Sequence, residues 1–170
     1  MKAAVLGNGK SRFLYTTPSK YDYVIGCNIP WTVVNAIVIS DERVIDYWGS
    51  VKVDKPNTNF ILSERAWKQL EESQYKNTVN VIDVLSVLDG AETSAHIAVK
   101  YLISKGYTDI DVYGCDSRFS DDIKSRTDSY IHKQNHSKDI VRIWNTCWDN
   151  IINQNSSVEI KFINESSCTL

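Results

Sequence analysis

The sequence predicts an α/β fold: a single Rossmann-like domain over residues 1–170, with a mostly parallel sheet and helices on both faces. Three observations predict it. Short apolar runs alternate with segments of helical spacing, and several of those runs end in a small residue followed by Asn or Asp. The chain has 170 residues, of which 42% are hydrophobic, and this composition suits one domain with an ordinary core.

The composition also argues against some partners. The formal net charge is -2, which gives no electrostatic case for a nucleic-acid partner. No apolar run is long enough to span a membrane, so we expect no membrane span. Of the five Trp and nine Tyr residues, most are expected in the core and some in a pocket or a subunit contact, which leaves a homo-oligomer open. The chain has four cysteines, Cys27, Cys115, Cys147 and Cys168. Their spacing is not that of metal ligands, and we expect reduced thiols in a cytoplasmic protein.

The segment 93–116 predicts one helix, one turn and one buried strand. Thr93 or Ser94 can cap the helix, and Gly106 follows its last turn. The helix carries an apolar stripe of Ala95, Ala98, Val99, Leu102 and Ile103. The strand that follows ends at Gly114 and Asp116, so it places a carboxylate at its carboxyl end. Ligands of open α/β sheets bind at that edge, although an ordinary loop Asp is an equal alternative.

The N-terminal segment predicts a strand, Lys2–Leu6, followed by a glycine turn. Residues 7–12, Gly-Asn-Gly-Lys-Ser-Arg, suit a phosphate or nucleotide loop, because glycines let a backbone approach a ligand and free N–H groups attract anions. The segment matches neither GxxxxGK[ST] nor GxGxxG. A plain tight turn is therefore the alternative.

Two further strands, residues 21–28 and 36–40, also end in polar side chains. In a parallel sheet all carboxyl ends lie at one edge, so we expect a site there, formed by Asn8, Asn28, Asp41 and Asp116.

The remaining elements are taken in chain order. Residues 63–74 predict a helix capped by Ser63, residues 79–82 a strand, and residues 51–58 an exposed connection. Residues 117–135 predict a mobile loop, because they are polar, long and without clear periodicity. A helix with Ser137 as its cap follows, then a strand at 158–163 and a loose tail.

Four segments together resemble the bacterial sialyltransferases of glycosyltransferase family 42. VLGNGKS at 5–11 is similar to that family's xxGNGPS loop, and YDYVIGCN at 21–28 to its YDVFRCN strand. Residues 93–116 are similar to its TSG…GY…GID block, and His136-Ser137-Lys138 to its GHSK segment. The resemblance implies a Rossmann-like fold and metal-independent transfer of a sialic-acid-like sugar from a CMP-activated donor to a glycan acceptor.

The resemblance also implies roles for individual residues. Ser94 matches a donor-site serine, Asp41 falls where the family has an Asn near the ribose, and His136 matches the general base. The implied nucleotide and donor site comprises Gly7, Asn8, Gly9, Ser11, Asn28, Asp41, Ser94 and Asp116. No cofactor and no metal are implied, since the CMP-sugar is a substrate.

The sequence departs from the family at several positions. Lys10 replaces a Pro, and Arg118 stands where a Tyr assists departure of the phosphate, a role that an Arg could take by binding phosphate oxygens. A second family Tyr has no clear counterpart, and the chain is shorter than the family's enzymes. A non-catalytic nucleotide or nucleotide-sugar binding protein stays open. So does a pterin diphosphokinase-like enzyme, in which Asp41 and Asp116 would hold Mg²⁺.

His136 also suits a general base on physical grounds. A base for an acceptor hydroxyl should titrate near neutral pH, and a helix N-terminus favours the neutral imidazole. His132 is the competing candidate, and His96 is expected to be structural.

Overall fold

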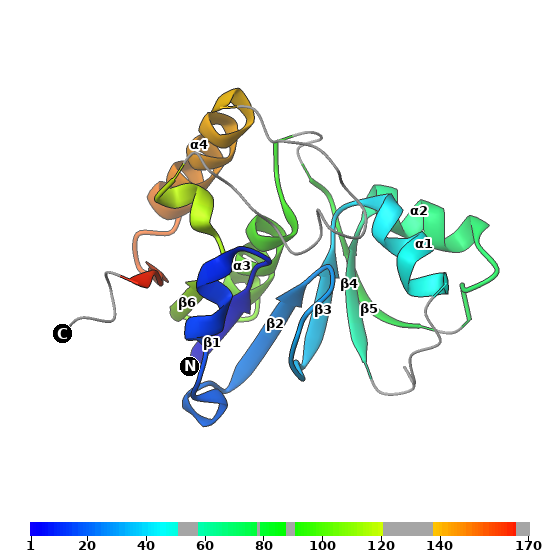
Figure 1. The fold of residues 1–170 in the computed structure, drawn as a ribbon, viewed down its shortest axis with the longest axis horizontal. Coiled ribbons are helices and arrows are strands. Elements are labelled where there is room, and N and C mark those ends of the chain that lie inside the picture. The colour runs from blue at the N-terminus through cyan, green and yellow to red at the C-terminus, as the bar shows by residue number, and fades with distance from the viewer. Residues whose placement is uncertain (51–57, 78, 88–90, 121–137, 166–170) are drawn as a thin grey trace.

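The structure is a computed structural model of the chain that describes residues 1–50, 58–77, 79–87, 91–120 and 138–165. Its elements are shown in Figure 1. The strands are β1 (Lys2–Leu6), β2 (Tyr23–Cys27), β3 (Ala36–Ile39), β4 (Asn59–Ser63), β5 (Asn80–Leu85), β6 (Asp109–Tyr113) and β7 (Glu159–Phe162). The α-helices are α1 (Glu42–Ser50), α2 (Glu64–Glu72), α3 (Ser94–Ser104) and α4 (Lys138–Gln154). The described residues also form the short 3₁₀ helices η1 (Lys10–Leu14), η2 (Pro18–Lys20) and η3 (Asp116–Arg118).

Within the described residues, seven strands form one sheet in the order β5-β4-β3-β2-β1-β6-β7, and every pair is parallel. The chain runs outward from β1 to β5 on one side and then returns to place β6 and β7 on the other. The sheet therefore reverses its winding between β1 and β6, which is where open α/β sheets bind ligands. The predicted Rossmann-like α/β fold is confirmed.

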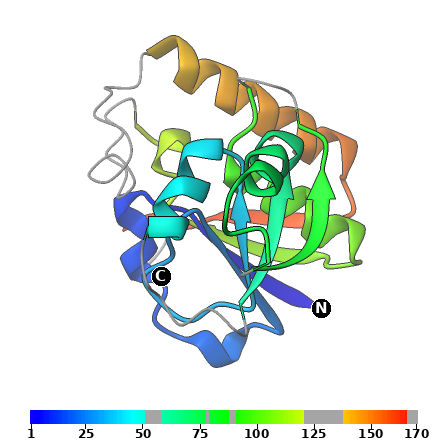
Figure 2. The ribbon, with the colours of Figure 1, turned by 90° about the vertical axis from the view of Figure 1, so that its right-hand side faces the viewer.

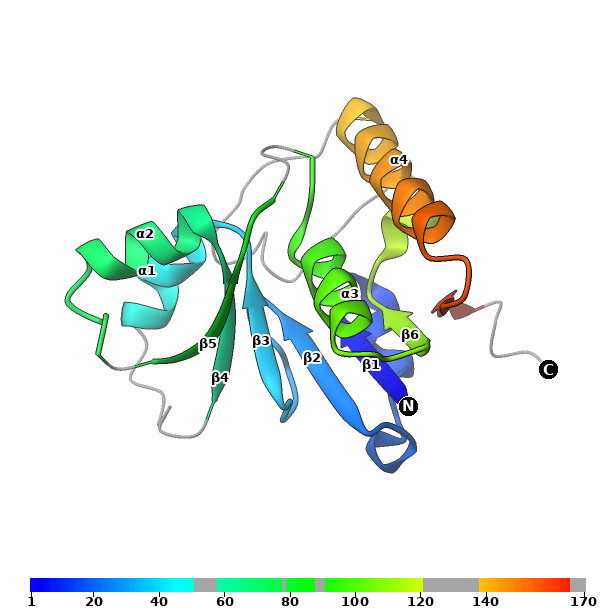
Figure 3. The same cartoon turned by 180° about the vertical axis from the view of Figure 1, so that it is seen from behind.

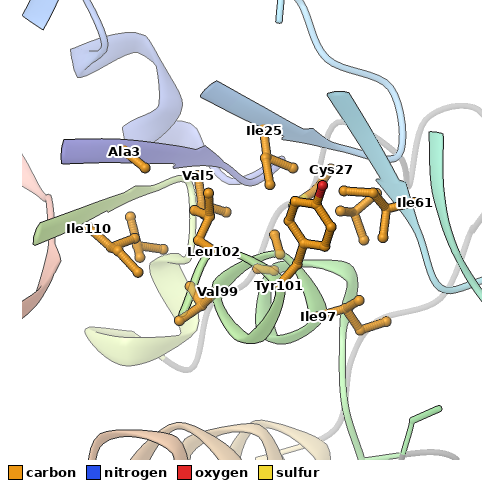
Figure 4. Packing of buried hydrophobic residues seen from close by; sticks show 14 of the residues in the cluster. Ala3, Val5, Ile25, Cys27, Ile61, Ile97, Val99, Tyr101, Leu102 and Ile110 are labelled. Carbon is orange, nitrogen blue, oxygen red and sulfur yellow. The ribbon is translucent and has the colours of Figure 1, made fainter. Parts of the chain in front are cut away.

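Helices cover both faces of the sheet, because alternate residues of each strand point to opposite faces. On one face α3 packs against β1, β2 and β3, and its Val99 and Leu102 face Val5 and Ile110 (Figure 4). Figure 3 shows this face toward the viewer, with α3 in front of the strands. On the other face α1 and α2 cover β3 and β4. The core thus consists of an apolar layer on each face of the sheet, and polar residues lie at the carboxyl edge of the strands.

The segment 93–116 folds as predicted. Thr93 caps α3 through a capping box with His96, and Gly106 ends the turn after it with a φ of +85°. The predicted cap of α2 is also confirmed, since Ser63 Oγ accepts from the backbone N–H of Ala66 at 3.1 Å.

Among the α-helices and strands of the described residues, α1 and β4 were not predicted, and the strand predicted at 79–82 extends over Asn80–Leu85. The predicted last strand is present as β7. Of the predicted mobile loop, residues 117–120 are described and begin in η3, whereas 121–135 lie outside the described residues, as do most of the connection at 51–58 and the tail at 166–170. No helix in the described part of the chain is long and apolar enough to cross a membrane.

One charged group lies inside the fold, away from the carboxyl edge. Asp111 on β6 is 1% exposed, and its carboxylate accepts hydrogen bonds from Tyr21 Oη at 2.7 Å and from Lys20 Nζ at 3.2 Å. Lys2 Nζ lies 3.3 Å from the same oxygen. Burial by itself would raise the pKa of Asp111, but the hydrogen bonds from Tyr21, Lys20 and Lys2 outweigh it, so the pKa lies below its usual value.

Asp111 should therefore make the stability of the fold depend on pH. Because its pKa is lower in the folded state than in the unfolded chain, its contribution is fully present above about pH 5 and is lost as the pH falls through the folded-state pKa. Urea unfolding of the wild type and of Asp111→Asn from pH 3 to pH 7 should show a difference in unfolding free energy that narrows toward low pH. A difference that stays constant or widens there would contradict this assignment.

Candidate site at the carboxyl edge of the sheet

The four strand ends predicted to form a site belong to neighbouring strands. Asn8 follows β1, Asn28 follows β2, Asp41 lies two residues after β3, and Asp116 comes after β6. These strands lie side by side in the order β3-β2-β1-β6 with their carboxyl ends at one edge. In Figure 2, α4 runs across the end of the sheet toward which the strand arrows point.

Ser94, the first residue of α3, links two of these ends. Its hydroxyl donates to Asn28 Oδ1 at 2.8 Å and accepts from the backbone N–H of Ser40 at 3.0 Å. It also lies 2.9 Å from the hydroxyl of Ser40. With three partners, the hydroxyl of Ser94 acts as an internal support that orients Asn28.

Asn28 is held in one conformation by its neighbours. Its φ is +57°, a left-handed value that Asn tolerates better than most residues. Its N–H donates to Val38 O at 2.8 Å, and its own carbonyl accepts from Trp48 Nε1 at 2.9 Å. Since Oδ1 is occupied by Ser94, the free group of the side chain is Nδ2, which has no acceptor among the described residues.

Asn8 presents the opposite chemistry. It is buried, and its Nδ2 donates to Cys27 O at 2.9 Å. Its Oδ1 has no donor among the described residues and is left as an acceptor. The ends of β1 and β2 thus offer one fixed acceptor and one fixed donor.

The glycine loop after β1 packs on its own chain. Gly7 N–H donates to Tyr113 O at 2.7 Å, and Gly9 N–H donates to Gly114 O at 2.8 Å. A Cβ added at Gly7 would lie 2.5 Å from Gly114 O, and one at Gly9 would lie 2.5 Å from Asp116 Oδ2. Both glycines are therefore needed for close contact with the strand end of β6, independently of any ligand.

Ser11 and Asp116 complete this contact. The Asp116 carboxylate accepts from the Ser11 hydroxyl and, at 3.2 Å, from the Ser11 N–H, while the Ser11 hydroxyl accepts from Gly114 N–H at 2.9 Å. The carboxylate of Asp116 thus accepts the hydrogen bond of the Ser11 N–H, the group at which the sequence suggested a bound phosphate. A ligand phosphate could reach Ser11 only by displacing Asp116.

Two other predicted residues form ion pairs of their own. Asp41 pairs with Arg43 through two side-chain hydrogen bonds of 2.9 and 2.7 Å. Arg118 Nη1 lies 3.0 Å from Asp149 and 3.3 Å from Asn145 Oδ1, both on α4, so it ties η3 to that helix.

The predicted base, His136, lies outside the described residues, as does His132. His96 is described and is structural, as expected: it is fully buried, its Nδ1 accepts from Thr93 N–H at 2.9 Å, and its Nε2 lies 3.1 Å from Trp144 O. Burial lowers the pKa of His96 to about 4, although the hydrogen bond to Trp144 acts in the opposite direction. His96 is therefore neutral at physiological pH and joins α3 to α4.

Sequence reasoning missed Ser40, which takes the place in the network that Asp41 was expected to take. Ser40 directly follows β3 and contacts Ser94, and Ser63 Oγ donates to its carbonyl at 2.8 Å. The end of β3 could have indicated Ser40, because the first residue after a parallel strand lies at the carboxyl edge of the sheet.

The fold and its carboxyl edge define the class of the protein: a doubly wound α/β domain with a pair of amide side chains at the ends of β1 and β2, next to the point where the strand order reverses. Comparison of the chain with protein-family models, with curated proteins and with solved structures found no match in any of the three. The link to the sialyltransferases therefore depends on the four sequence segments, and their function enters as a proposal.

Proposed function

We propose that the protein binds a CMP-activated sugar at the carboxyl edge of β1 and β2 and transfers that sugar, sialic-acid-like, to a glycan hydroxyl without a metal ion. One observation carries this proposal. Asn8 and Asn28 each have one amide atom engaged by the fold, and the other is left toward a ligand: Oδ1 of Asn8 and Nδ2 of Asn28. An acceptor beside a donor suits the hydroxyl and phosphate oxygens of a nucleotide.

The fixed orientation of the two amides supports binding energetically. Side chains already held by Cys27 and Ser94 lose little conformational freedom when a ligand arrives, so more of the hydrogen-bond energy appears as affinity. The location supports it as well, because the pair lies next to the switch point of the sheet.

A second candidate, a nucleotide or nucleotide-sugar binding protein without catalysis, is favoured by Arg118. The proposed role of Arg118 is to stabilise the leaving phosphate, yet its Nη1 is bound to Asp149 and Asn145. A binding protein would keep the amide pair and would need neither Arg118 nor His136.

The pterin diphosphokinase-like alternative gains no such support. It requires Asp41 and Asp116 to hold Mg²⁺ together. Asp41 is instead paired with Arg43, and Asp116 with Ser11, so each carboxylate would first have to leave its partner.

A cytoplasmic location belongs to the same proposal. Cys27, Cys115 and Cys147 are free thiols in the structure. Such thiols suit a reducing compartment, where an activated nucleotide-sugar would also be available.

The test is calorimetry with CMP in the presence of EDTA. The informative variant is Asn28→Gly, because Gly adopts a φ of +57° without strain and only the side chain is lost. Its affinity for CMP should fall by roughly 1–3 kcal/mol, the cost of leaving a polar partner unpaired. Asn153→Ala, an exposed position on α4, is the control and should bind as the wild type does. Absence of heat with CMP in the wild type would refute the proposal.

A further inference from the structure

Two exposed aromatic side chains lie in the segments that follow β1 and β2, the strands whose ends carry Asn8 and Asn28. Phe13 on η1 is 57% exposed, and Trp31 in the β2–β3 connection is 37% exposed. Their ring centroids are 5.7 Å apart, and the ring planes are inclined by 56°. We call this pair the aromatic shelf. Large aromatic surface left in water next to polar ligand groups is typical of a binding surface.

The shelf is physically continuous with the loop that carries Asn8. Arg12 Nη1 donates to Asn8 O at 2.6 Å and to Gly9 O at 2.9 Å. The guanidinium of the same Arg12 lies 4.3 Å from the ring centroid of Phe13. Phe13 is therefore only one side chain away from the Asn8 backbone, and a cation lies between them.

The other half of the shelf belongs to the loop that carries Asn28. Trp31 is the third residue after Asn28. The loop between them is anchored, because Ile29 is buried and Pro30 packs closely on Gly26. A Cβ added at Gly26 would lie only 2.6 Å from Pro30 Cβ. Both rings are thus placed by the same two strand ends as the amide pair.

We infer that the aromatic shelf stacks the pyrimidine base of the nucleotide whose polar part binds Asn8 and Asn28. This inference rests on the proposed function and adds the position of the base to it. A nucleotide joins a planar ring to a hydroxylated and anionic part within one small molecule, and the segments after β1 and β2 carry both kinds of matching group. The guanidinium of Arg12 lies over the ring of Phe13 and adds positive charge next to the aromatic shelf.

The inclination of the two rings decides how the base is held. Because the planes differ by 56°, a flat base can lie parallel to one ring only and meets the other with its edge. Stacking and edge contacts are both favourable for aromatic rings. Such a surface recognises the π-face of a base and therefore contributes to affinity more than to the choice between bases.

The experiment is calorimetry with CMP on Phe13→Ala and Trp31→Ala. Each should weaken CMP binding roughly five- to a hundred-fold, the range found for the loss of one stacked aromatic ring. Trp31→Phe should retain most of the affinity, whereas Trp31→Leu, which is apolar without a π-face, should lose it. Ile143→Ala is the control, since Ile143 is a large apolar side chain, 41% exposed, on α4.

The outcomes separate this inference from the proposed function. If the wild type binds CMP and both alanine variants bind it equally well, the shelf does not hold the base, and the nucleotide site stands. If Trp31→Leu binds as tightly as Trp31→Phe, stacking is refuted as the source of the affinity. If the alanine variants change self-association and leave CMP affinity unchanged, the shelf is a contact between protein copies. If the wild type binds no CMP, both proposals fail.

Discussion

His136→Ala is expected to lower sugar transfer by roughly a hundred- to ten-thousand-fold, the usual range for loss of a general base, while the affinity for CMP stays near that of the wild type. The two quantities should separate because a general base acts on the acceptor hydroxyl in the transition state and not on the bound nucleotide. Release of CMP from a CMP-sugar, with lactose-type acceptors present, measures the first, and calorimetry measures the second.

The structure reduces the number of competing bases. The chain has three histidines, and His96 is fully buried with a pKa lowered to about 4 by burial. A base for a sugar hydroxyl must reach the substrate, which His96 does not. His132 and His136 remain as candidates, and both lie outside the described residues. The sequence favours His136, because a helix N-terminus just after a histidine would favour its neutral, proton-accepting form.

His132→Ala is the control for this prediction and should keep most of the turnover. The pH–rate profile of the wild type should rise on the acid side as His136 loses its proton. Full turnover in His136→Ala would show that another group is the base. If wild type and variant are equally inactive while CMP binds to both, the protein is a non-catalytic binding protein, the candidate that the contacts of Arg118 favour.

The strands and the central helix could be predicted because their sequence patterns are local. Buried parallel strands appear as short apolar runs, and α3 carries both its cap at Thr93 and its stop at Gly106. β4 was missed because its five residues run directly into the cap of α2, at Ser63, without an intervening turn. Short strands of this kind have no periodicity of their own.

The site was harder to predict for a chemical reason. Asn, Asp and Ser after a strand can face a ligand, cap a helix or bind neighbouring loops, and the residue type is the same in each case. Asp41 was expected in the site, but its carboxylate also accepts from the N–H of Arg43 at the start of α1, the helix that was missed. Had α1 been recognised, Asp41 would have been assigned to that helix, and Ser40 would have been the edge residue.

The glycine loop poses the same ambiguity, and Gly7→Ala resolves it. We expect this change to destabilise the fold by about 3 kcal/mol, at the upper end of the usual range for overpacking. The added Cβ would lie 2.5 Å from Gly114 O and 3.0 Å from Tyr113 O, and these are backbone atoms of a strand end that cannot rotate away. The two strand ends would have to separate, which weakens the 2.7 Å hydrogen bond from Gly7 N–H to Tyr113 O.

Gly106→Ala is the matched control because it tests the other reason for a glycine, which is a positive φ. Gly106 has a φ of +85°, and a Cβ there would meet only Met1 Cε at 3.8 Å, so that variant suffers backbone strain of roughly 1–2 kcal/mol without a clash. Urea unfolding should therefore show a larger loss for Gly7→Ala than for Gly106→Ala. If Gly7→Ala unfolds at the wild-type urea concentration but no longer binds CMP, the glycine serves the ligand, and the packing explanation of the loop is wrong. Loss of stability in the predicted order would mean that Gly7, which the sequence placed in a candidate phosphate loop, instead allows the close contact between the ends of β1 and β6. Ligand binding would then depend on the side chains of Asn8 and Asn28.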